Sequence, residues 1–254
     1  MADALVVRDV TVRFGGVQAL SEAELTAPLD AITAVIGPNG AGKTTLLGVI
    51  SGAVTPARGS VHLCGSDLSG LPPHARAAAG VVRTFQNLEI FSNMSVLDNV
   101  MTGAHLLAKY SLLGSLLRTP AFVREERRLR EWSLAKLDFV GLAHKRDLPA
   151  GDLPYGEQRL LELARAISCG PRMLLLDEPA AGMNTGETAA LGVLIRRIRD
   201  DLGIGVVLVE HDMDLVMDIS ERVAVLNFGS ILATGTPAEI QDNPEVVTAY
   251  LGED

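Results

Sequence analysis

A glycine-rich segment, GPNGAGKTT, at residues 37–45 sets the strongest limit on the fold of this chain. It fits the pattern G-x-x-x-x-G-K-[ST], with an apolar run at residues 31–36 before it and a helical pattern from Gly42 after it. Glycines let the backbone turn so tightly that successive N–H groups point at phosphate oxygens, and the N-terminus of the following helix adds partial positive charge. The segment therefore predicts a phosphate-binding loop between a strand and a helix.

The side chains of this loop have separate predicted parts. Lys43 supplies a point charge for the β- and γ-phosphates of a nucleotide, and the Thr44 hydroxyl is suited to Mg²⁺. The remaining positions contribute backbone N–H groups and turn geometry. The predicted nucleotide-binding residues are Gly37, Pro38, Asn39, Gly40, Ala41, Gly42, Lys43, Thr44 and Thr45.

A second apolar strand, predicted at residues 172–176, is followed directly by Asp177 and Glu178. Ligands of open α/β sheets bind at the carboxyl ends of the strands. We expect Asp177 to hold Mg²⁺, directly or through its waters, because this hard ion prefers oxygen ligands. Glu178 is then placed to orient and deprotonate an attacking water. Such a strand end is common by itself, and its position downstream of the phosphate loop makes it a prediction of hydrolysis.

A third apolar strand, predicted at residues 205–209, ends in Glu210-His211-Asp212. We expect His211 to hydrogen-bond the γ-phosphate or the attacking water. A histidine at a strand end is more often structural. The functional interpretation depends on its place in the order of motifs along the chain.

The chain organisation is an α/β pattern interrupted by a helical insertion. The nucleotide-binding core is predicted at residues 1–94 and 151–254, and the insertion at residues 95–150. Ser95 and Asp98 have the spacing of a capping box, and apolar residues then return at helical intervals. The many charges at residues 121–141 are interpreted as a solvated helix face, with a docking surface as the alternative. Further strands are predicted at residues 4–14, 59–64, 80–84 and 222–226, and further helices at residues 186–202 and 213–219.

Composition argues against several classes of protein. The 31 acidic and 22 basic residues give a net charge of −9, so no global basic field for nucleic acid is present. Cys64 and Cys169 match no metal or redox spacing, which favours a reducing cytosol. No apolar run reaches the ~18 residues of a membrane helix, and no signal peptide is recognised at the start. We therefore expect a chain that does not span a bilayer.

The order of the motifs resembles that of the nucleotide-binding subunits of ABC transporters over essentially the whole chain. The quoted segments are GPNGAGKTT, RTFQN, LPYGEQRLLELARAI, MLLLDEP and VEHDM. The resemblance implies an α/β fold with a P-loop NTPase core of the ABC ATPase type, an N-terminal antiparallel β portion and a helical subdomain insertion. It also implies that the chain binds ATP with Mg²⁺ and hydrolyses ATP.

The resemblance implies roles for further residues. Phe14 would stack on adenine, although an ordinary core aromatic is the alternative. Gln86 would contact Mg²⁺ or the attacking water and relay the nucleotide state to a membrane partner. Tyr155, Gly156 and Glu157 belong to the signature loop, which would contact ATP held by a second subunit through the N-terminus of the following helix. ATP would then join two half-sites, and hydrolysis would release them.

Two departures from the family pattern bear on the rate of turnover. The common signature LSGGQ is replaced by residues 153–157, LPYGE, so its serine is absent. Backbone N–H groups or Tyr155 would have to substitute. Asn184 stands where many relatives carry aspartate. A catalytically weak binding module is therefore one alternative to a working ATPase.

The subfamily is indicated by several features together. They are the tyrosine in the signature, the DEPAAG-x-N run, the long insertion at residues 101–150 and the tail at residues 249–252. They resemble the ATP-binding subunits of branched-chain amino acid importers. The segment at residues 71–76 and the same tail also resemble the ATPase of lipopolysaccharide export. A soluble ABC ATPase with no role in transport is a third alternative.

A subunit of this family implies specific partners. The chain would lie peripherally at the cytoplasmic face of the cell membrane, bound to two multi-span permease subunits. A second ABC ATPase, identical or merely similar, would complete the ATP sites, an extracytoplasmic solute-binding protein would deliver the solute, and no nucleic acid is expected. The permease surface is expected near residues 86–99 and the helical insertion, where Phe91, Met94 and Leu97 are alternatively plain core.

Overall fold

The structure is a computed structural model that describes residues 4–84, 88–109, 116 and 118–251. It divides into two compact units, one of residues 1–86 and 172–254 and the other of residues 87–171. The helical unit is thus longer at both ends than the insertion expected at residues 95–150.

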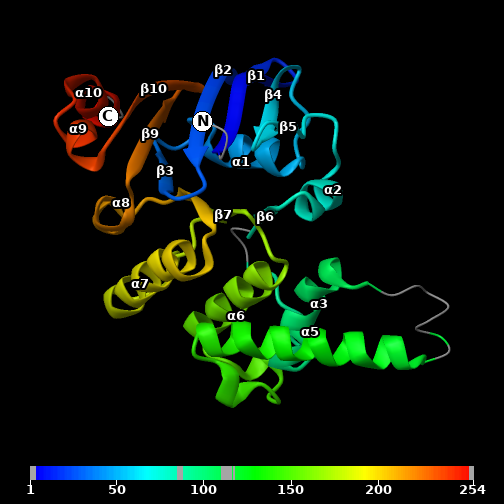
Figure 1. The fold of residues 1–254 in the computed structure, drawn as a ribbon. Coiled ribbons are helices and arrows are strands. Elements are labelled where there is room, and N and C mark those ends of the chain that lie inside the picture. Colours follow the sequence, from blue (N-terminus) through cyan, green and yellow to red (C-terminus); the bar gives the residue numbers. More distant parts are fainter. Residues whose placement is uncertain (1–3, 85–87, 110–115, 117, 252–254) are drawn as a thin grey trace. The chain divides into compact units, whose positions relative to one another are not determined.

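A six-stranded sheet forms the centre of the first unit, with the strand order β10-β9-β3-β8-β7-β6 (Figure 1). Five strands run parallel and β10 pairs antiparallel with β9. Every residue of β3, β7 and β8 is buried, as expected for parallel strands covered on both faces. The bounds are β3 Ile32–Ile36, β6 Val81–Arg83, β7 Met173–Asp177, β8 Gly205–Val209, β9 Arg222–Asn227 and β10 Ser230–Gly235.

An antiparallel sheet of four strands, in the order β2-β1-β4-β5, confirms the predicted N-terminal β portion (Figure 1). One hydrophobic core joins this sheet to helix α1 and to the central sheet, with Leu5, Leu46 and Val207 among its fully buried members. The bounds are β1 Ala4–Phe14, β2 Val17–Pro28, β4 Arg58–Leu63 and β5 Ser66–Asp67.

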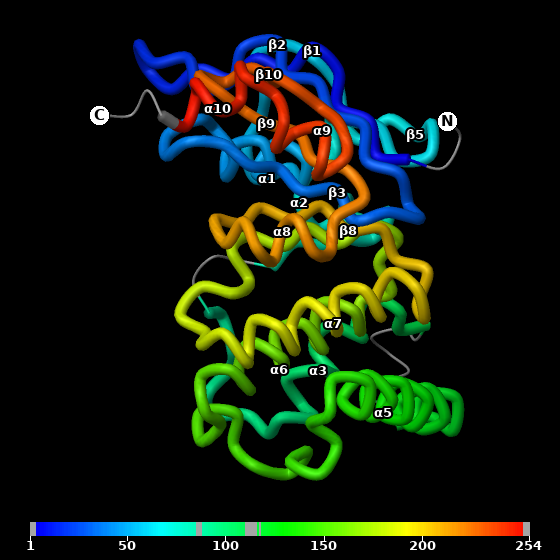
Figure 2. Tube along the Cα trace, turned by 90° about the vertical axis from the view of Figure 1, so that its left-hand side faces the viewer, coloured from blue at the N-terminus to red at the C-terminus, as the bar shows by residue number. Residues whose placement is uncertain are grey.

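The helices of the first unit cover the central sheet. A second core packs Val216 of α8, Ile240 of α9 and Val246 of α10 against strands β3 and β9. Figure 2 shows α9 and α10 beside β9 and β10. The bounds are α1 Lys43–Ser51, α2 Pro73–Ala78, α7 Thr185–Leu202, α8 Met213–Ile219, α9 Pro237–Gln241 and α10 Pro244–Leu251.

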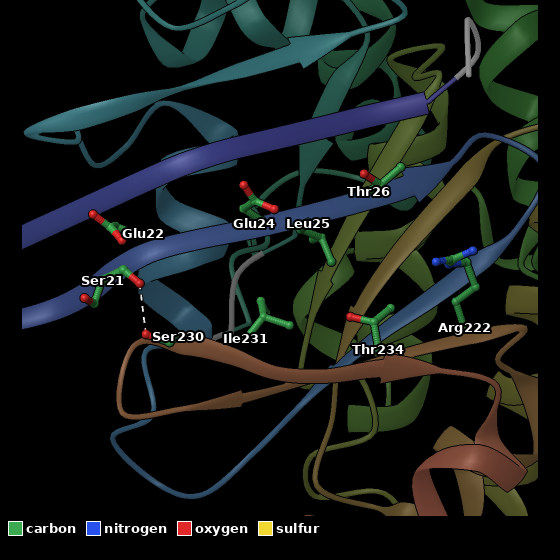
Figure 3. A pocket seen from close by; sticks show the side chains of 9 residues that line it. All are labelled: Ser21, Glu22, Glu24, Leu25, Thr26, Arg222, Ser230, Ile231 and Thr234. Atoms are coloured by element: carbon green, nitrogen blue, oxygen red, sulfur yellow. Dashed lines mark hydrogen bonds between the residues drawn. The ribbon is translucent and has the colours of Figure 1, made fainter.

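Two edge strands that the sequence pattern did not predict, β2 and β10, meet at one end. Ser21 N–H donates to the Gly229 carbonyl at 2.8 Å, and the Ser230 hydroxyl donates to the Ser21 carbonyl at 2.9 Å. From there the strands diverge and leave a surface pocket between them (Figure 3). Its lining residues are Ser21, Glu22, Glu24, Leu25, Thr26, Arg222, Ser230, Ile231 and Thr234.

The helical unit is built from α3, α5 and α6, each of which packs against the other two (Figure 1). A Cβ on Gly103 of α3 would lie 2.2 Å from the Arg165 carbonyl oxygen of α6, so this helix crossing requires glycine. Trp132 Nε1 of α5 donates to the Ser168 carbonyl at 2.9 Å. The bounds are α3 Val96–Ala104, α5 Pro120–Phe139 and α6 Tyr155–Ser168, with 3₁₀ turns at His105–Leu107, Ala143–Lys145 and Ala150–Asp152.

These contacts explain why the unit extends to residue 171. Helix α6 buries Leu161, Ala164 and Ile167 and packs on α3 and α5, so it belongs to the same unit. Ser95 caps α3 by accepting from Asp98 N–H at 3.0 Å, as its spacing predicted. Leu97 is core, whereas Phe91 is 51% exposed.

In the described part of the chain, no helix combines the length and the apolar character that crossing a membrane would take.

Candidate functional site

The predicted phosphate loop, at residues 37–45, runs from the end of β3 into α1, and close backbone approach requires glycine at two of its positions. Gly37 has φ 149°, and a Cβ there would lie 1.9 Å from the Leu226 carbonyl oxygen. Gly42 has φ 106°, and its Cβ would lie 2.6 Å from the Ala19 carbonyl oxygen. Both values of φ disfavour any residue with a side chain. The β9–β10 turn braces the loop, because Gly229 N–H donates to the Ala41 carbonyl at 2.9 Å.

Lys43 lies inside the curve of this loop. Its side chain is buried, with 7% exposed, and Nζ donates to the carbonyls of Gly37 at 2.6 Å and Pro38 at 2.9 Å. The ammonium group therefore holds the loop curled around itself. Gly42, at the N-cap of α1, has no side chain with which to cap the helix. A helix start of this kind is suited to bind an anion through its first N–H groups.

Asp177 lies fully buried at the carboxyl end of β7. Its Oδ2 accepts from Arg83 Nη2 of β6 at 2.6 Å, and the two side chains form an ion pair of 12% and 0% exposure. Its Oδ1 is buried and has no hydrogen-bond partner among the described residues. A buried carboxylate oxygen that lacks a protein donor is a suitable ligand for a hard cation such as Mg²⁺, or for one of its waters.

Glu178 follows in a strained backbone conformation, with φ 49°. Its N–H continues the sheet by donating to the Val209 carbonyl at 2.9 Å. Non-glycine residues rarely adopt this left-handed region, and they persist there when the surrounding structure dictates it.

The structure brings Glu178 and His211 into contact. His211 Nε2 lies 3.1 Å from Glu178 Oε1, and their side chains are 48% and 18% exposed. They come from adjacent parallel strands, since Asp177 of β7 pairs in register with Val209 of β8. A carboxylate and an imidazole in hydrogen-bond contact can share the work of orienting and deprotonating a water.

Two residues at this edge of the sheet were not singled out from the sequence. Arg83 is the ion-pair partner of Asp177, and Glu210 is a buried carboxylate, 4% exposed, beside His211. The only sequence signal for either was a charge inside or next to an apolar strand, and such a charge does not name its partner.

For the other predicted site residues of this unit, the structure gives at most a position or an exposure and no contact that tests their role. Phe14 ends β1 and is 54% exposed, so it does not fill the core. Its stacking on adenine stays a prediction. Gln86 lies outside the described residues. Thr44 is exposed at the start of α1, next to Lys43.

The signature loop belongs to the helical unit, where it starts α6. Pro154 is the N-cap and supplies no side-chain hydrogen bond. Lys145 Nζ donates to both carboxylate oxygens of Glu157, at 2.7 and 2.6 Å. The Tyr155 hydroxyl accepts from Arg159 Nε at 3.1 Å. The tyrosine hydroxyl thus has a partner on its own helix, and the first turn of α6 lacks a side-chain cap.

Asn184 has a structural part. Its Oδ1 accepts from Glu187 N–H at 3.0 Å, and its own N–H donates to Glu187 Oε2 at 3.0 Å. The two residues form a capping box at the start of α7. Asparagine and aspartate cap helices about equally well, so this departure keeps the local fold.

Comparison with known proteins agrees with this geometry. Residues 20–181 match the family described as ABC transporter, and residues 230–254 match the family described as branched-chain amino acid ATP-binding cassette transporter. The chain is 45% identical to the high-affinity branched-chain amino acid transport ATP-binding protein BraF of Pseudomonas aeruginosa, over 98% of each chain. It is 42% identical to LivG of Escherichia coli, which carries the same description, again over 98% of each chain.

The fold is also that of solved ABC proteins. The crystal structure of the ADP conformation of an ATP-binding cassette of an ABC transporter matches with a TM-score of 0.85 and 30% identity, over 99% of each chain. This likeness confirms the predicted fold class. The chain therefore belongs to the ABC transporter family as one of its ATP-hydrolysing subunits, and within it to the family of branched-chain amino acid transport ATP-binding proteins.

Proposed function

We propose that this chain powers the uptake of branched-chain or other hydrophobic amino acids through separate membrane subunits. The observation that carries the chemistry is the contact between Glu178 and His211, 3.1 Å apart at the carboxyl edge of the sheet. The amino acid substrate is supported by the family match at residues 230–254 and by relatives named for that transport along the whole chain.

ATP is held by the phosphate loop in this proposal. Backbone N–H groups of the loop, which every position except Pro38 carries, take the phosphate oxygens, and Lys43 exchanges its contacts with the Gly37 and Pro38 carbonyls for contacts with the β- and γ-phosphates. Phe14, exposed at the end of β1, stacks on adenine.

The proposed metal is Mg²⁺, bound near Thr44 and Asp177 and, from the sequence, Gln86. Mg²⁺ supplies positive charge that neutralises the phosphates as the bond to the γ-phosphate breaks. The unpartnered Oδ1 of Asp177 supports this assignment. Among the described residues, no cluster of three or more His, Cys, Asp or Glu side chains offers a protein-only metal site.

Hydrolysis then depends on two side chains. Glu178 orients the attacking water and takes its proton at Oε1 or Oε2. His211, whose Nε2 contacts Glu178 Oε1, positions that carboxylate and the γ-phosphate. A general base of this kind contributes roughly 10²–10⁴-fold to a rate.

The proposal gives the chain several partners. A second ABC ATPase, identical or similar, receives Tyr155, Gly156 and Glu157 against its own ATP. Two multi-span permeases bind the chain at the cytoplasmic face of the membrane, and an extracytoplasmic protein delivers the solute. The helix start at α6, which lacks a side-chain cap, supports the shared ATP site.

Leucine uptake tests the proposal directly. The chain is tagged and isolated gently from native membranes, and its stoichiometric partners are identified by mass spectrometry. Energised vesicles with wild-type chain should accumulate labelled leucine, and vesicles with Glu178→Gln should not. Glu24→Gln, an exposed carboxylate on β2, is the matched control and should transport normally.

Other outcomes would assign the chain elsewhere. Recovery with permeases of a lipopolysaccharide exporter, with no leucine uptake, would contradict the amino acid substrate. Recovery in the soluble fraction with ribosomes or nucleic acid would contradict transport altogether.

A further inference from the structure

We propose that Glu210 is a positioning residue for ATP hydrolysis, because its buried carboxylate fastens the loop that carries Glu178 to the loop that carries His211. The inference rests on the proposed catalytic roles of Glu178 and His211 and adds a residue that acts through them.

The carboxylate of Glu210 bridges two loops. On one side, Oε1 accepts from the N–H of Ala180, two residues after Glu178, at 2.7 Å. On the other side, Oε2 accepts from the N–H of His211 at 2.9 Å and from that of Asp212 at 3.5 Å. One side chain thus joins the turn after β7 to the turn after β8.

The charge of Glu210 has no cationic partner in the described part of the chain, and its side chain is 4% exposed. Its charge is therefore stabilised by backbone N–H groups. Such charge-assisted hydrogen bonds are about twice as strong as neutral ones. A carboxylate offers acceptors on both oxygens, whereas glutamine would point an amide NH₂ at one of the N–H donors. The site is therefore specific for a carboxylate.

The position of this bridge links it to catalysis. Glu178 adopts φ 49°, and a residue in that region keeps its conformation when its surroundings fix it. Its N–H bond to Val209 fixes one side of the turn, and Glu210 fixes the other through Ala180. Loss of the bridge lets the turn shift, and misplacement by about 1 Å costs on the order of 10²-fold in rate.

The bridge joins Ala180 to His211 and Asp212, which lie outside the phosphate loop. The phosphate loop is held by its own bonds, from Lys43 to Gly37 and Pro38 and from Gly229 to Ala41. A change at Glu210 should therefore lower kcat and leave the Kd for ATP in place.

The experiment compares Glu210→Gln with the wild-type chain in the assembled transporter. We expect kcat for ATP hydrolysis to fall about 10–100-fold, with the Kd for ATP changed by less than about twofold. In the Glu178→Gln background, the same substitution should change residual turnover by less than about threefold, because residues that act as a unit are not additive.

Glu221→Gln is the matched control. Glu221 Oε2 accepts from Ile32 N–H at 2.7 Å at the opposite, amino-terminal edge of the same sheet. That substitution should leave kcat unchanged, although it removes a carboxylate from a backbone contact and from its ion pair with Arg199.

Several results would overturn the inference. One is a kcat of Glu210→Gln within twofold of wild type, and another is a loss of turnover that weaker ATP binding explains. A third is a double variant whose kcat falls by the product of the two single losses. If Glu178→Gln itself keeps normal turnover, the proposed catalytic site is wrong. That result is distinct from failure of the Glu210 inference alone, in which Glu178→Gln still loses turnover.

A second variant and a direct measurement guard against misfolding of Glu210→Gln. Glu210→Asp keeps the charge but is shorter by one methylene, so it cannot span both loops and should also lose kcat. In the wild-type chain, hydrogen exchange should show protected amides at Ala180 and His211. Rapid exchange at Ala180 would contradict the bridge.

Discussion

The two regions that the motifs assign to nucleotide are built in different ways. At the carboxyl edge of the sheet, Asp177 pairs with Arg83 of β6, 94 residues away, and Glu178 contacts His211 after β8, 33 residues away. At the start of α6, Glu157 is held by Lys145, 12 residues away. The arrangement at the carboxyl edge depends on contacts between residues far apart in the sequence, whereas the signature segment is held by residues close to it in the sequence. Single substitutions should therefore lower kcat or the free energy of unfolding far more at the carboxyl edge of the sheet than at the start of α6.

The largest effect should come from Glu178→Gln. Loss of the base should lower kcat by roughly 10²–10⁴-fold, while ATP still binds, because Lys43 and the loop are unchanged. Steady-state phosphate release and nucleotide binding measure the two quantities, with the exposed Glu24→Gln as control. Near-normal turnover would remove Glu178 from the role of base and with it the contrast between the regions.

Arg83→Met should cause the next largest effect, on folding. It leaves Asp177 as an uncompensated buried charge, and breaking such a pair costs about 3–5 kcal/mol in the free energy of unfolding. Urea unfolding measures it. Mg²⁺ with ATP should restore part of the loss, because the cation supplies charge beside Asp177.

The control for Arg83→Met is Arg196→Met, which breaks the exposed pair with Asp218. An exposed pair of this kind is worth about 0–1 kcal/mol. If both substitutions lower the free energy of unfolding equally, the burial of Asp177 is not the cause of the large loss in Arg83→Met.

Lys145→Met tests the locally built region. Its pair with Glu157 is partly exposed, at 25% and 29%, so unfolding should change by about 1 kcal/mol or less. Steady-state ATP turnover should fall only about 2–5-fold. Without Lys145, the negative charge of Glu157 is no longer neutralised near the helix start that is proposed to face ATP phosphates. A loss of turnover as large as that of Glu178→Gln would show that the start of α6 is as sensitive to substitution as the carboxyl edge.

Asn184→Asp should have the smallest effect. Both residues cap helices well, and the capping box with Glu187 remains possible, so the free energy of unfolding should change by about 0.5 kcal/mol or less. Thermal or urea unfolding measures it. A large gain in ATP turnover would show that the asparagine limits catalysis.

The elements predicted from sequence were those with strong local patterns. The runs at residues 172–176 and 205–209 and the helix after Gly42 were found to within one or two residues, since uninterrupted apolar runs and helical periodicity are local signals. Strands β2 and β10 were missed. Both are edge strands: β2 has many exposed positions and β10 is mostly half-buried, and their pairing with β1 and β9 is decided in three dimensions.

The candidate site shows the same distinction between local sequence patterns and contacts made in three dimensions. The prediction of a phosphate loop needed no tertiary information, because a segment of nine residues carries its own turn geometry and its lysine. The sequence also predicted that Asp177, Glu178 and His211 end buried strands. Three contacts became visible in the folded chain: Glu178 with His211, Arg83 with Asp177, and Glu210 with two loops. These contacts could not be predicted locally because they depend on strand order and register, which bring distant residues to one edge of a sheet.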